Sequence, residues 1–189
     1  RARKSRTITL AAAVVVTLLA AVAITVSHRM QSSARREYVA VLPTTIETGD
    51  GIILEQHETI RSSVQQALQQ SVLETPDLAL TSSREAQSET GGLAEIRAAL
   101  GAQEIIVSSL TCRKVRQCEL TVERLGGADL AVIQKRTTSI IVDLSLESYN
   151  IVQRQWRRLY PGSEGFQDPS GLISEEDYRT FLELYDASR

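Results

Sequence analysis

Histidine and cysteine are scarce in this 189-residue chain, which contains two of each. A structural zinc site takes four nitrogen or sulfur ligands. His28 follows a long apolar run, and His57 lies on the apolar side of a predicted helix. His57 is expected to pack there, with one ring nitrogen bonded to a nearby group. The sequence therefore predicts no metal site.

The short motifs that mark common catalytic sites are also missing. The sequence has no G-x-S-x-G turn, no cysteine with an available histidine, and no Gly-rich loop ending in Lys-Ser or Lys-Thr. Glu47, Asp50 and Glu55 gather near a predicted turn, but scattered surface carboxylates are the ordinary case. We therefore expect no catalytic residue, no cofactor and no enzymatic activity in this chain.

Net charge is small as well, at −2. Nucleic-acid-binding domains carry a clear excess of basic residues, which this chain lacks, so we predict no nucleic-acid partner. The one local basic cluster consists of Arg113, Lys114 and Arg116, between two predicted strands. Solvated hairpin tips have this composition too, but the three side chains are candidates for contact with an anionic protein or with lipid headgroups.

A run of twenty uncharged residues extends from Ile8 to Ser27. At about 1.5 Å per residue, a helix of this length crosses the roughly 30 Å hydrocarbon core of a bilayer. A signal peptide usually has a shorter apolar region, of about 7 to 15 residues, and a buried soluble helix would need apolar contacts all round. We expect residues 8–27 to form a single transmembrane helix, with a basic cytoplasmic flank at 1–7 and a juxtamembrane linker at 28–37.

Basic residues lie on both sides of this run, so charge gives only a slight bias to its orientation. They are Arg1, Arg3, Lys4 and Arg6 before it and Arg29, Arg35 and Arg36 after it. Because the chain begins with Arg1 and not with Met, we expect it to be part of a longer protein in which the apolar run is internal.

Residues 38–160 have the pattern of one α/β or α+β domain. Proline, glycine and the change between two-residue and helical periodicity predict the element order βαβαβββα. The predicted strands are 38–44, 78–81, 104–112, 118–125 and 130–139, and the predicted helices are 53–72, 93–100 and 143–160. The early crossover helix and the late hairpins favour a mixed sheet with helices on one face. Pro43 should end the first strand, Gly101 the second helix, and Asp143 should cap the third.

The end of the chain divides into a linker and a helix. Residues 161–173 are rich in Pro, Gly and Ser, as linkers are. In the helix predicted at 174–189, Ser174 and Asp177 resemble a capping box. Its apolar stripe consists of Tyr178, Phe181, Leu182 and Tyr185. We expect this stripe to need a partner helix from further along a longer protein, with 174–189 as the first helix of a helical repeat.

Cys112 and Cys118 are expected to face each other across the hairpin formed by strands 104–112 and 118–125. A disulfide is geometrically reasonable there, and it would form in an oxidising compartment. Two reduced, half-buried thiols are the alternative. If the bridge forms, the domain lies outside the cytoplasm.

Four segments together resemble a known family: YVAVLP, RSSVQQALQQ, LGAQEIIVSSLTCRKVRQCELTVERLGGADL and LYPG. They look like the TolB amino-terminal-like domain found outside the membrane in bacterial transmembrane Ser/Thr protein kinases, over about residues 38–162. The resemblance implies a cytoplasmic kinase domain before the span and tetratricopeptide repeats after the domain. No catalytic residue carries over to this chain, since the kinase motifs would precede Arg1.

These observations together predict a single-pass protein of the inner membrane with an extracytoplasmic, non-catalytic sensor or protein-interaction domain, most readily of a Ser/Thr kinase receptor. Its partners would be the bilayer and a protein or small-molecule ligand in the envelope. Two alternatives remain open, a periplasmic scaffold subunit and the outer domain of a membrane-bound transcriptional regulator.

Overall fold

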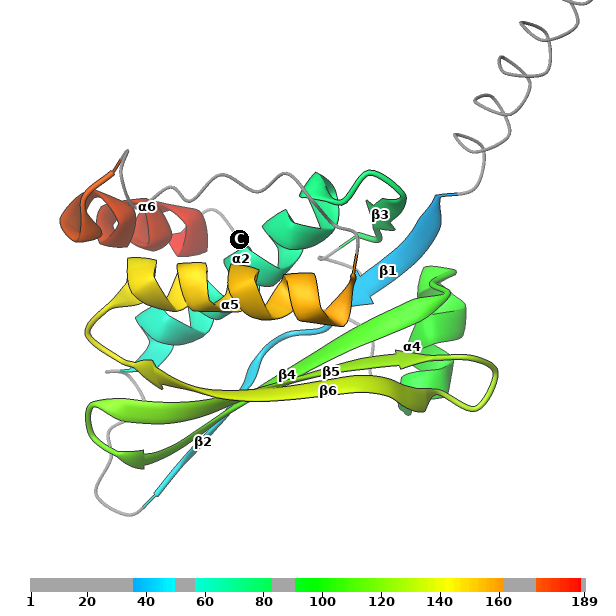
Figure 1. The fold of residues 1–189 in the computed structure, drawn as a ribbon, viewed down its shortest axis with the longest axis horizontal. Helices are drawn as coiled ribbons and strands as arrows, with labels where there is room; N and C mark the ends of the chain where they lie inside the picture. Colours follow the sequence, from blue (N-terminus) through cyan, green and yellow to red (C-terminus); the bar gives the residue numbers. More distant parts are fainter. Residues whose placement is uncertain (1–35, 50–56, 83–90, 162–172, 188–189) are drawn as a thin grey trace, which may run out of the picture. The chain divides into compact units, whose positions relative to one another are not determined.

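The computed structural model describes residues 36–49, 57–82, 91–161 and 173–187, and within them the chain forms six strands and four helices (Figure 1). The elements are β1 (Glu37–Val41), β2 (Thr45–Thr48), α2 (Glu58–Glu74), β3 (Leu78–Leu80), α4 (Leu93–Leu100), β4 (Glu104–Lys114), β5 (Gln117–Gly126), β6 (Ala131–Ile141), α5 (Ser145–Leu159) and α6 (Glu175–Ala187). The transmembrane helix expected at 8–27 lies outside these residues. No helix among the described residues is both long and apolar enough to cross a bilayer.

All six strands belong to one mixed sheet with the order β3-β1-β4-β5-β6, and β2 pairs with β4 off this path. The pairs β1–β3, β1–β4 and β2–β4 are parallel, whereas β4–β5 and β5–β6 are antiparallel. The mixed α+β architecture predicted from the sequence is therefore confirmed, including the closing meander of three long strands.

Strand β2 is absent from the predicted order. We expected the first strand to leave the sheet at Pro43; it ends at Val41, and after three residues the chain returns to the sheet and pairs Thr45 with Ser109 and Thr48 with Cys112. Proline has no N–H for the ladder, so it interrupts pairing without preventing a new start. The two short strands therefore lie one after the other along β4.

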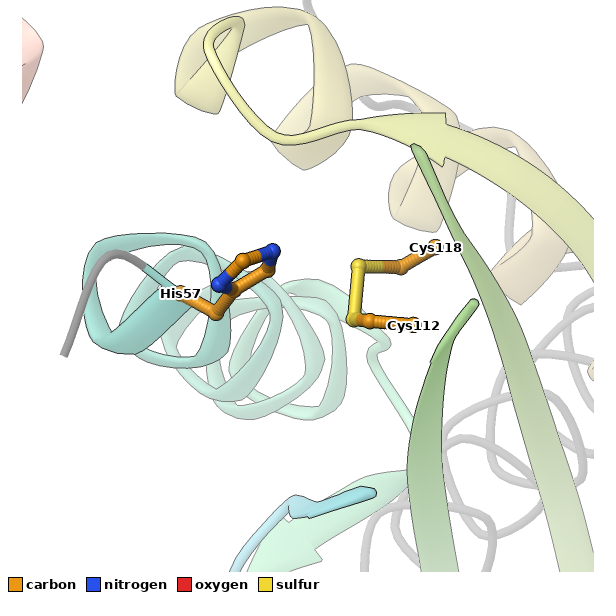
Figure 2. Close-up of side chains that lie close together, drawn as sticks. All are labelled: His57, Cys112 and Cys118. Atoms are coloured by element: carbon orange, nitrogen blue, oxygen red, sulfur yellow. A yellow bond between two sulfur atoms is a disulfide. The ribbon is translucent and has the colours of Figure 1, made fainter. Parts of the chain in front are cut away.

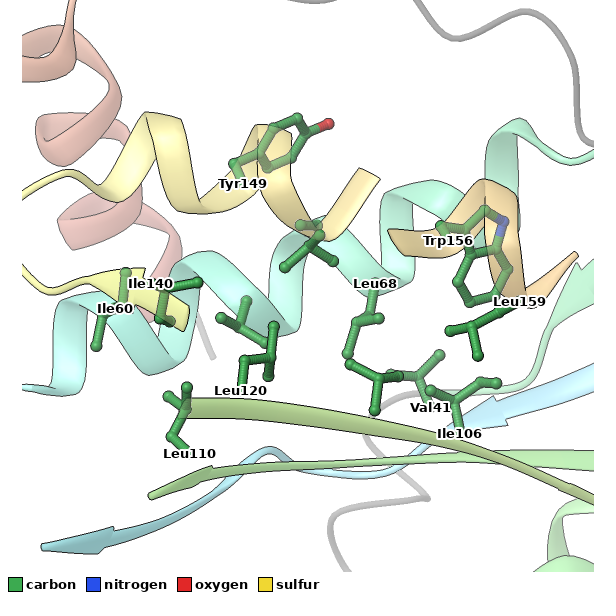
Figure 3. Close-up of a cluster of buried hydrophobic side chains, with 14 of the residues drawn as sticks. Val41, Ile60, Leu68, Ile106, Leu110, Leu120, Ile140, Tyr149, Trp156 and Leu159 are labelled. Atoms are coloured by element: carbon green, nitrogen blue, oxygen red, sulfur yellow. The ribbon is translucent and has the colours of Figure 1, made fainter. Parts of the chain in front are cut away.

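Helices α2 and α5 cover one face of the sheet (Figure 3). Within the helix predicted at 53–72, the apolar residues that belong to α2 are buried, with Ile60, Val64 and Val72 fully buried and Leu68 1 % exposed. Residues 53–56 of the predicted helix lie outside the described residues. The buried residues of α2 pack with Tyr149, Val152, Trp156 and Leu159 of α5 onto Val41, Ile106, Leu110, Leu120 and Ile140 of the sheet. Full burial of one such aliphatic side chain contributes about 2 kcal/mol. This layer is the main core.

The expectation of helices on one face only is wrong at one end of the sheet. Ile96 of α4 packs in a second, smaller cluster with Ala40, Leu42, Ile105 and Leu125. Successive residues of a strand point to opposite faces, so Ala40 and Val41 serve different clusters. Gly101, at φ 61°, ends α4 in the left-handed conformation that glycine adopts without strain, as predicted.

The N-terminus of α5 is capped from a distance. Asp143 does not cap it, because the helix begins two residues later, at Ser145, and Asp143 pairs with Arg116 at 2.6 Å instead. The carboxylate of Glu175 accepts hydrogen bonds from the backbone N–H groups of Ser145 (2.5 Å) and Leu146 (2.9 Å). A side chain at the start of α6 thus satisfies free donors of α5.

Helix α6 packs on α2 and α5, so part of its stripe finds cover within this chain. Tyr178 is 4 % and Leu182 1 % exposed, which corrects the expectation that the stripe lacks any partner here. Phe181 remains 45 % exposed. The predicted cap is confirmed, since the Ser174 hydroxyl accepts the N–H of Asp177 at 3.1 Å.

Replacement of Glu175 tests whether this remote cap holds α6 on the domain. The variant Glu175→Ala leaves two N–H groups of α5 unpaired, and loss of a cap costs about 1 to 2 kcal/mol. We expect a lower midpoint in thermal unfolding than for the matched variant Glu176→Ala, whose side chain is exposed on the same helix turn. Equal midpoints for the two variants would contradict the capping role.

Candidate functional site

Cys112 of β4 and Cys118 of β5 lie directly opposite each other and form a disulfide, with their Cα atoms 4.1 Å apart (Figure 2). The antiparallel register places the two cysteines side by side. In such a ladder, two opposite residues that share no backbone hydrogen bond have their Cα atoms about 4.5 Å apart. Both cysteines are almost completely buried, at 0 and 1 % exposure. The bridge therefore fixes the base of the β4–β5 tip inside the core.

His57 supports the same tip from the helix side. It is fully buried just before α2, and its ring is directed toward the disulfide (Figure 2). Its Nε2 lies 3.2 Å from the carbonyl oxygen of Val115, so this nitrogen carries the proton, because a carbonyl only accepts. The expectation of a packed histidine with a bonded ring nitrogen is confirmed.

The imidazole and the two sulfur atoms lie within 4.8 Å of one another, a grouping the sequence spacing did not predict. A metal ion would need thiolates, and the disulfide removes both of them. In this oxidation state the three residues form a brace for the hairpin tip.

The tip itself is basic and exposed. Arg113, Lys114 and Arg116 flank Val115, whose side chain is 58 % exposed. Arg116 pairs with Asp143, but its side chain is 78 % exposed, so the pair adds little stability. None of the salt bridges among the described residues involves Arg113 or Lys114. These two cations thus face solvent, and their role in binding stays a prediction.

An apolar hollow of about 550 Å³ lies beside the basic tip. It is lined by Ile141 at the end of β6 and by Leu144, which are 45 and 37 % exposed, together with Arg116, Gln117 and Asp143. We use the name tip patch for Arg113, Lys114, Val115, Arg116, Ile141 and Leu144. The sequence analysis identified only the basic residues of this patch. Ile141 and Leu144 lie far from them in the sequence and come close only because β6 pairs with β5.

Strand β6 forms the outer edge of the sheet next to the tip patch. The N–H of Val142 donates to the carbonyl of Arg116 at 3.1 Å, so the backbone groups of its neighbour Ile141 point away from β5. The carbonyl of Ile141 is already bonded, because it accepts the N–H of Leu144 at 3.2 Å and the hydroxyl of Ser148 at 3.4 Å as the chain turns from β6 into α5.

A buried ion pair lies at the opposite end of the sheet. Arg124 donates two hydrogen bonds to Glu104, at 2.8 and 2.5 Å, and a third to the carbonyl of Leu159 at 3.1 Å. Its guanidinium also lies 4.0 Å from the ring centre of Tyr160, whose hydroxyl donates to Glu104. Burial and this hydrogen bond raise the pKa of Tyr160 above its ordinary value. The cluster ties the end of α5 to the sheet, a structural role that the sequence analysis missed.

No protein-family model matches the chain, and no curated protein sequence matches it. The chain has limited similarity to solved structures. One is the PelC dodecamer from Paraburkholderia phytofirmans, with TM-score 0.43, 12 % identity, and coverage of 64 % of this chain and 84 % of that one. Another is the LpoB C-terminal domain from Salmonella enterica, with TM-score 0.42, 14 % identity, and coverage of 61 % of this chain and 91 % of that one.

TolB from Acinetobacter baumannii is also similar, with TM-score 0.46, 8 % identity, and coverage of 67 % of this chain and 29 % of that one. The TM-scores of all three structures lie below 0.5, so these likenesses assign neither a family nor a function to this chain.

Proposed function

We propose that this chain is the membrane anchor and extracytoplasmic protein-interaction domain of a bacterial signalling receptor whose parent protein is a Ser/Thr kinase. The carrying observation is the Cys112–Cys118 disulfide, buried in the main core. Structural disulfides form and persist in oxidising compartments outside the cytoplasm. The uncharged run at 8–27 supports the anchor, and the sequence resemblance supports the kinase and the repeats.

The tip patch is the proposed contact surface. Its apolar hollow is lined by Ile141 and Leu144, and the exposed Val115 and the cations of Arg113 and Lys114 lie on the hairpin loop beside that hollow. Apolar centres with charged rims are typical of protein interfaces. The basic rim favours a partner segment that places carboxylates around an apolar side chain.

The brace under the tip makes it suitable for binding. The disulfide and the His57–Val115 contact hold the loop in one conformation before a partner arrives, which lowers the entropy lost on binding. Binding would then change the association of the outer domains, and the membrane helix would pass this change to the cytoplasmic part.

Charge reversal at the tip tests this proposal in the full-length parent protein in its own membrane. We expect the double variant Arg113→Glu/Lys114→Glu to lose most of the change in kinase activity that envelope conditions cause, as does deletion of residues 38–189. The matched control Arg154→Glu changes an exposed arginine of α5 and should respond as the wild type does. Abundance and the disulfide should be unchanged in both.

Two outcomes would count against this function. A normal response after deletion of 38–189 would exclude a sensor role for the domain. A normal response in the tip variant, with none in the deletion, would keep the sensor role and move the contact away from the tip patch.

A further inference from the structure

A polar pocket of about 510 Å³ lies apart from the tip patch, where three segments meet. The connection between β1 and β2, the first half of α2 and the end of α6 form its walls. The polar residues of its lining are Thr44, Glu58, Arg61, Ser62, Gln65 and Asp186. Its volume lies within the range of small-molecule sites, roughly 300 to 1,000 Å³.

Gln65 is held in one orientation by Thr44. Its Oε1 accepts the backbone N–H of Thr44 at 2.8 Å and the Thr44 hydroxyl at 3.0 Å. Because a backbone N–H only donates, the amide oxygen must occupy this position and the Nε2 must lie on the other side. Thr44 is fixed in turn by Ser108, with 2.8 Å between the hydroxyl oxygens.

The Nε2 of Gln65 has no hydrogen-bond acceptor among the described residues. Gln65 as a whole is only 4 % exposed. Its Nε2 is nevertheless absent from the set of fully buried polar atoms without a partner, so solvent reaches this atom. Gln65 is one of the residues that line the pocket, and because Thr44 occupies its amide oxygen, Nε2 is the polar atom of this side chain that remains for a ligand. An acceptor group of a ligand in the pocket would take the place of the water that otherwise hydrates this N–H donor.

Charged groups of both signs lie around this donor. Arg61 pairs with Glu58 at 2.6 Å, and both side chains are about 40 % exposed, so the guanidinium retains N–H groups for another acceptor. Asp186 of α6 accepts a hydrogen bond from Ser62 at 2.5 Å and keeps its second oxygen. The lining thus offers donors at Gln65 and Arg61 and a carboxylate at Asp186.

We propose that this pocket binds a small zwitterion, a free amino acid or a short peptide. Gln65 and Arg61 receive its carboxylate, and Asp186 receives its ammonium group. Because Asp186 belongs to α6 while Gln65 and Arg61 belong to α2, the occupant links the two helices. This binding is independent of protein docking at the tip patch, and either can fail without the other.

Calorimetric titration of the full chain in detergent micelles tests the site. The probes are L-alanine, D-alanine and the dipeptide L-alanyl-L-alanine, with N-acetyl-L-alanine and L-alanine amide as analogues that lack one of the two charges. We expect at least one zwitterion to bind and both singly charged analogues to bind about tenfold more weakly or worse. Absence of binding by all three zwitterions at up to about 10 mM would overturn the proposal.

Two variants localise the binding. Gln65→Glu keeps the acceptor for Thr44 but places a carboxylate where the amide donated, so we expect at least about a tenfold loss of affinity. Asp186→Asn changes an exposed residue of α6 and should weaken binding of the zwitterions while leaving binding of N-acetyl-L-alanine unaffected. Gln155→Glu, outside the lining, is the control for added charge. If Gln65→Glu and Asp186→Asn, both folded by circular dichroism, bind as the wild type does, the pocket is not the site.

Discussion

Replacement of Arg124 by methionine is expected to cost about 3 to 5 kcal/mol of folding free energy. The Glu104 side chain is 5 % exposed, and Arg124→Met removes the cation that forms its ion pair. Among the described residues, its carboxylate would keep the hydroxyl of Tyr160 as its hydrogen-bond donor. A carboxylate buried without a counter-charge pays a desolvation penalty that one neutral donor does not offset.

A matched control comes from the neighbouring strands. Lys135 and Glu123 also form an ion pair, at 2.6 Å, but the lysine is 58 % exposed, so Lys135→Met should cost no more than about 1 kcal/mol. The double variant Glu104→Gln/Arg124→Met should recover much of the loss, since no charge is then left buried. Urea unfolding of the three variants measures the differences. Similar losses for Arg124→Met and Lys135→Met would show that burial does not set the cost.

The helices and strands could be predicted where the spacing of apolar residues and the position of glycine determine them. The apolar spacing of Ile60, Val64 and Leu68 can serve only a helix with one buried face, and the glycine at 101 allows the left-handed stop. β2 was missed because four residues after a proline carry no distinctive signal, and their partner β4 lies about sixty residues further on. Glu175 was missed as the cap of α5 for the same reason, since Asp143 is the local candidate.

The residues of the candidate sites could likewise be predicted where they are close in the sequence, and not where tertiary packing brings them together. Cys112, Cys118 and the basic residues between them are adjacent in the sequence, so hairpin spacing alone brings them together. His57 and Ile141 reach the tip only through tertiary packing and strand pairing. The pocket is harder still, because Ser62 and Asp186 meet across 124 positions, and polar residues on the buried side of α2 resemble surface positions when the sequence is read alone.

Removal of the disulfide is expected to destabilise the domain by about 2 to 3 kcal/mol and to loosen the tip. The bridge closes a loop between residues six positions apart, and loop-closure entropy in the unfolded chain gives about 2 kcal/mol for such a short loop. The double variant Cys112→Ala/Cys118→Ala also loses sulfur contacts in the main core, which adds to the cost.

Unfolding by guanidinium with and without reductant separates the bridge from the packing. The wild type should lose stability when reductant is added, whereas the double alanine variant should not respond to it. Faster amide hydrogen exchange at Val142 should accompany the loss, because its N–H donates to the carbonyl of Arg116 at 3.1 Å and this carbonyl depends on the bridge for its position. If reduced wild type kept its full stability and its slow exchange, His57 and the β4–β5 ladder alone would hold the tip, and the brace assigned to the disulfide would be wrong.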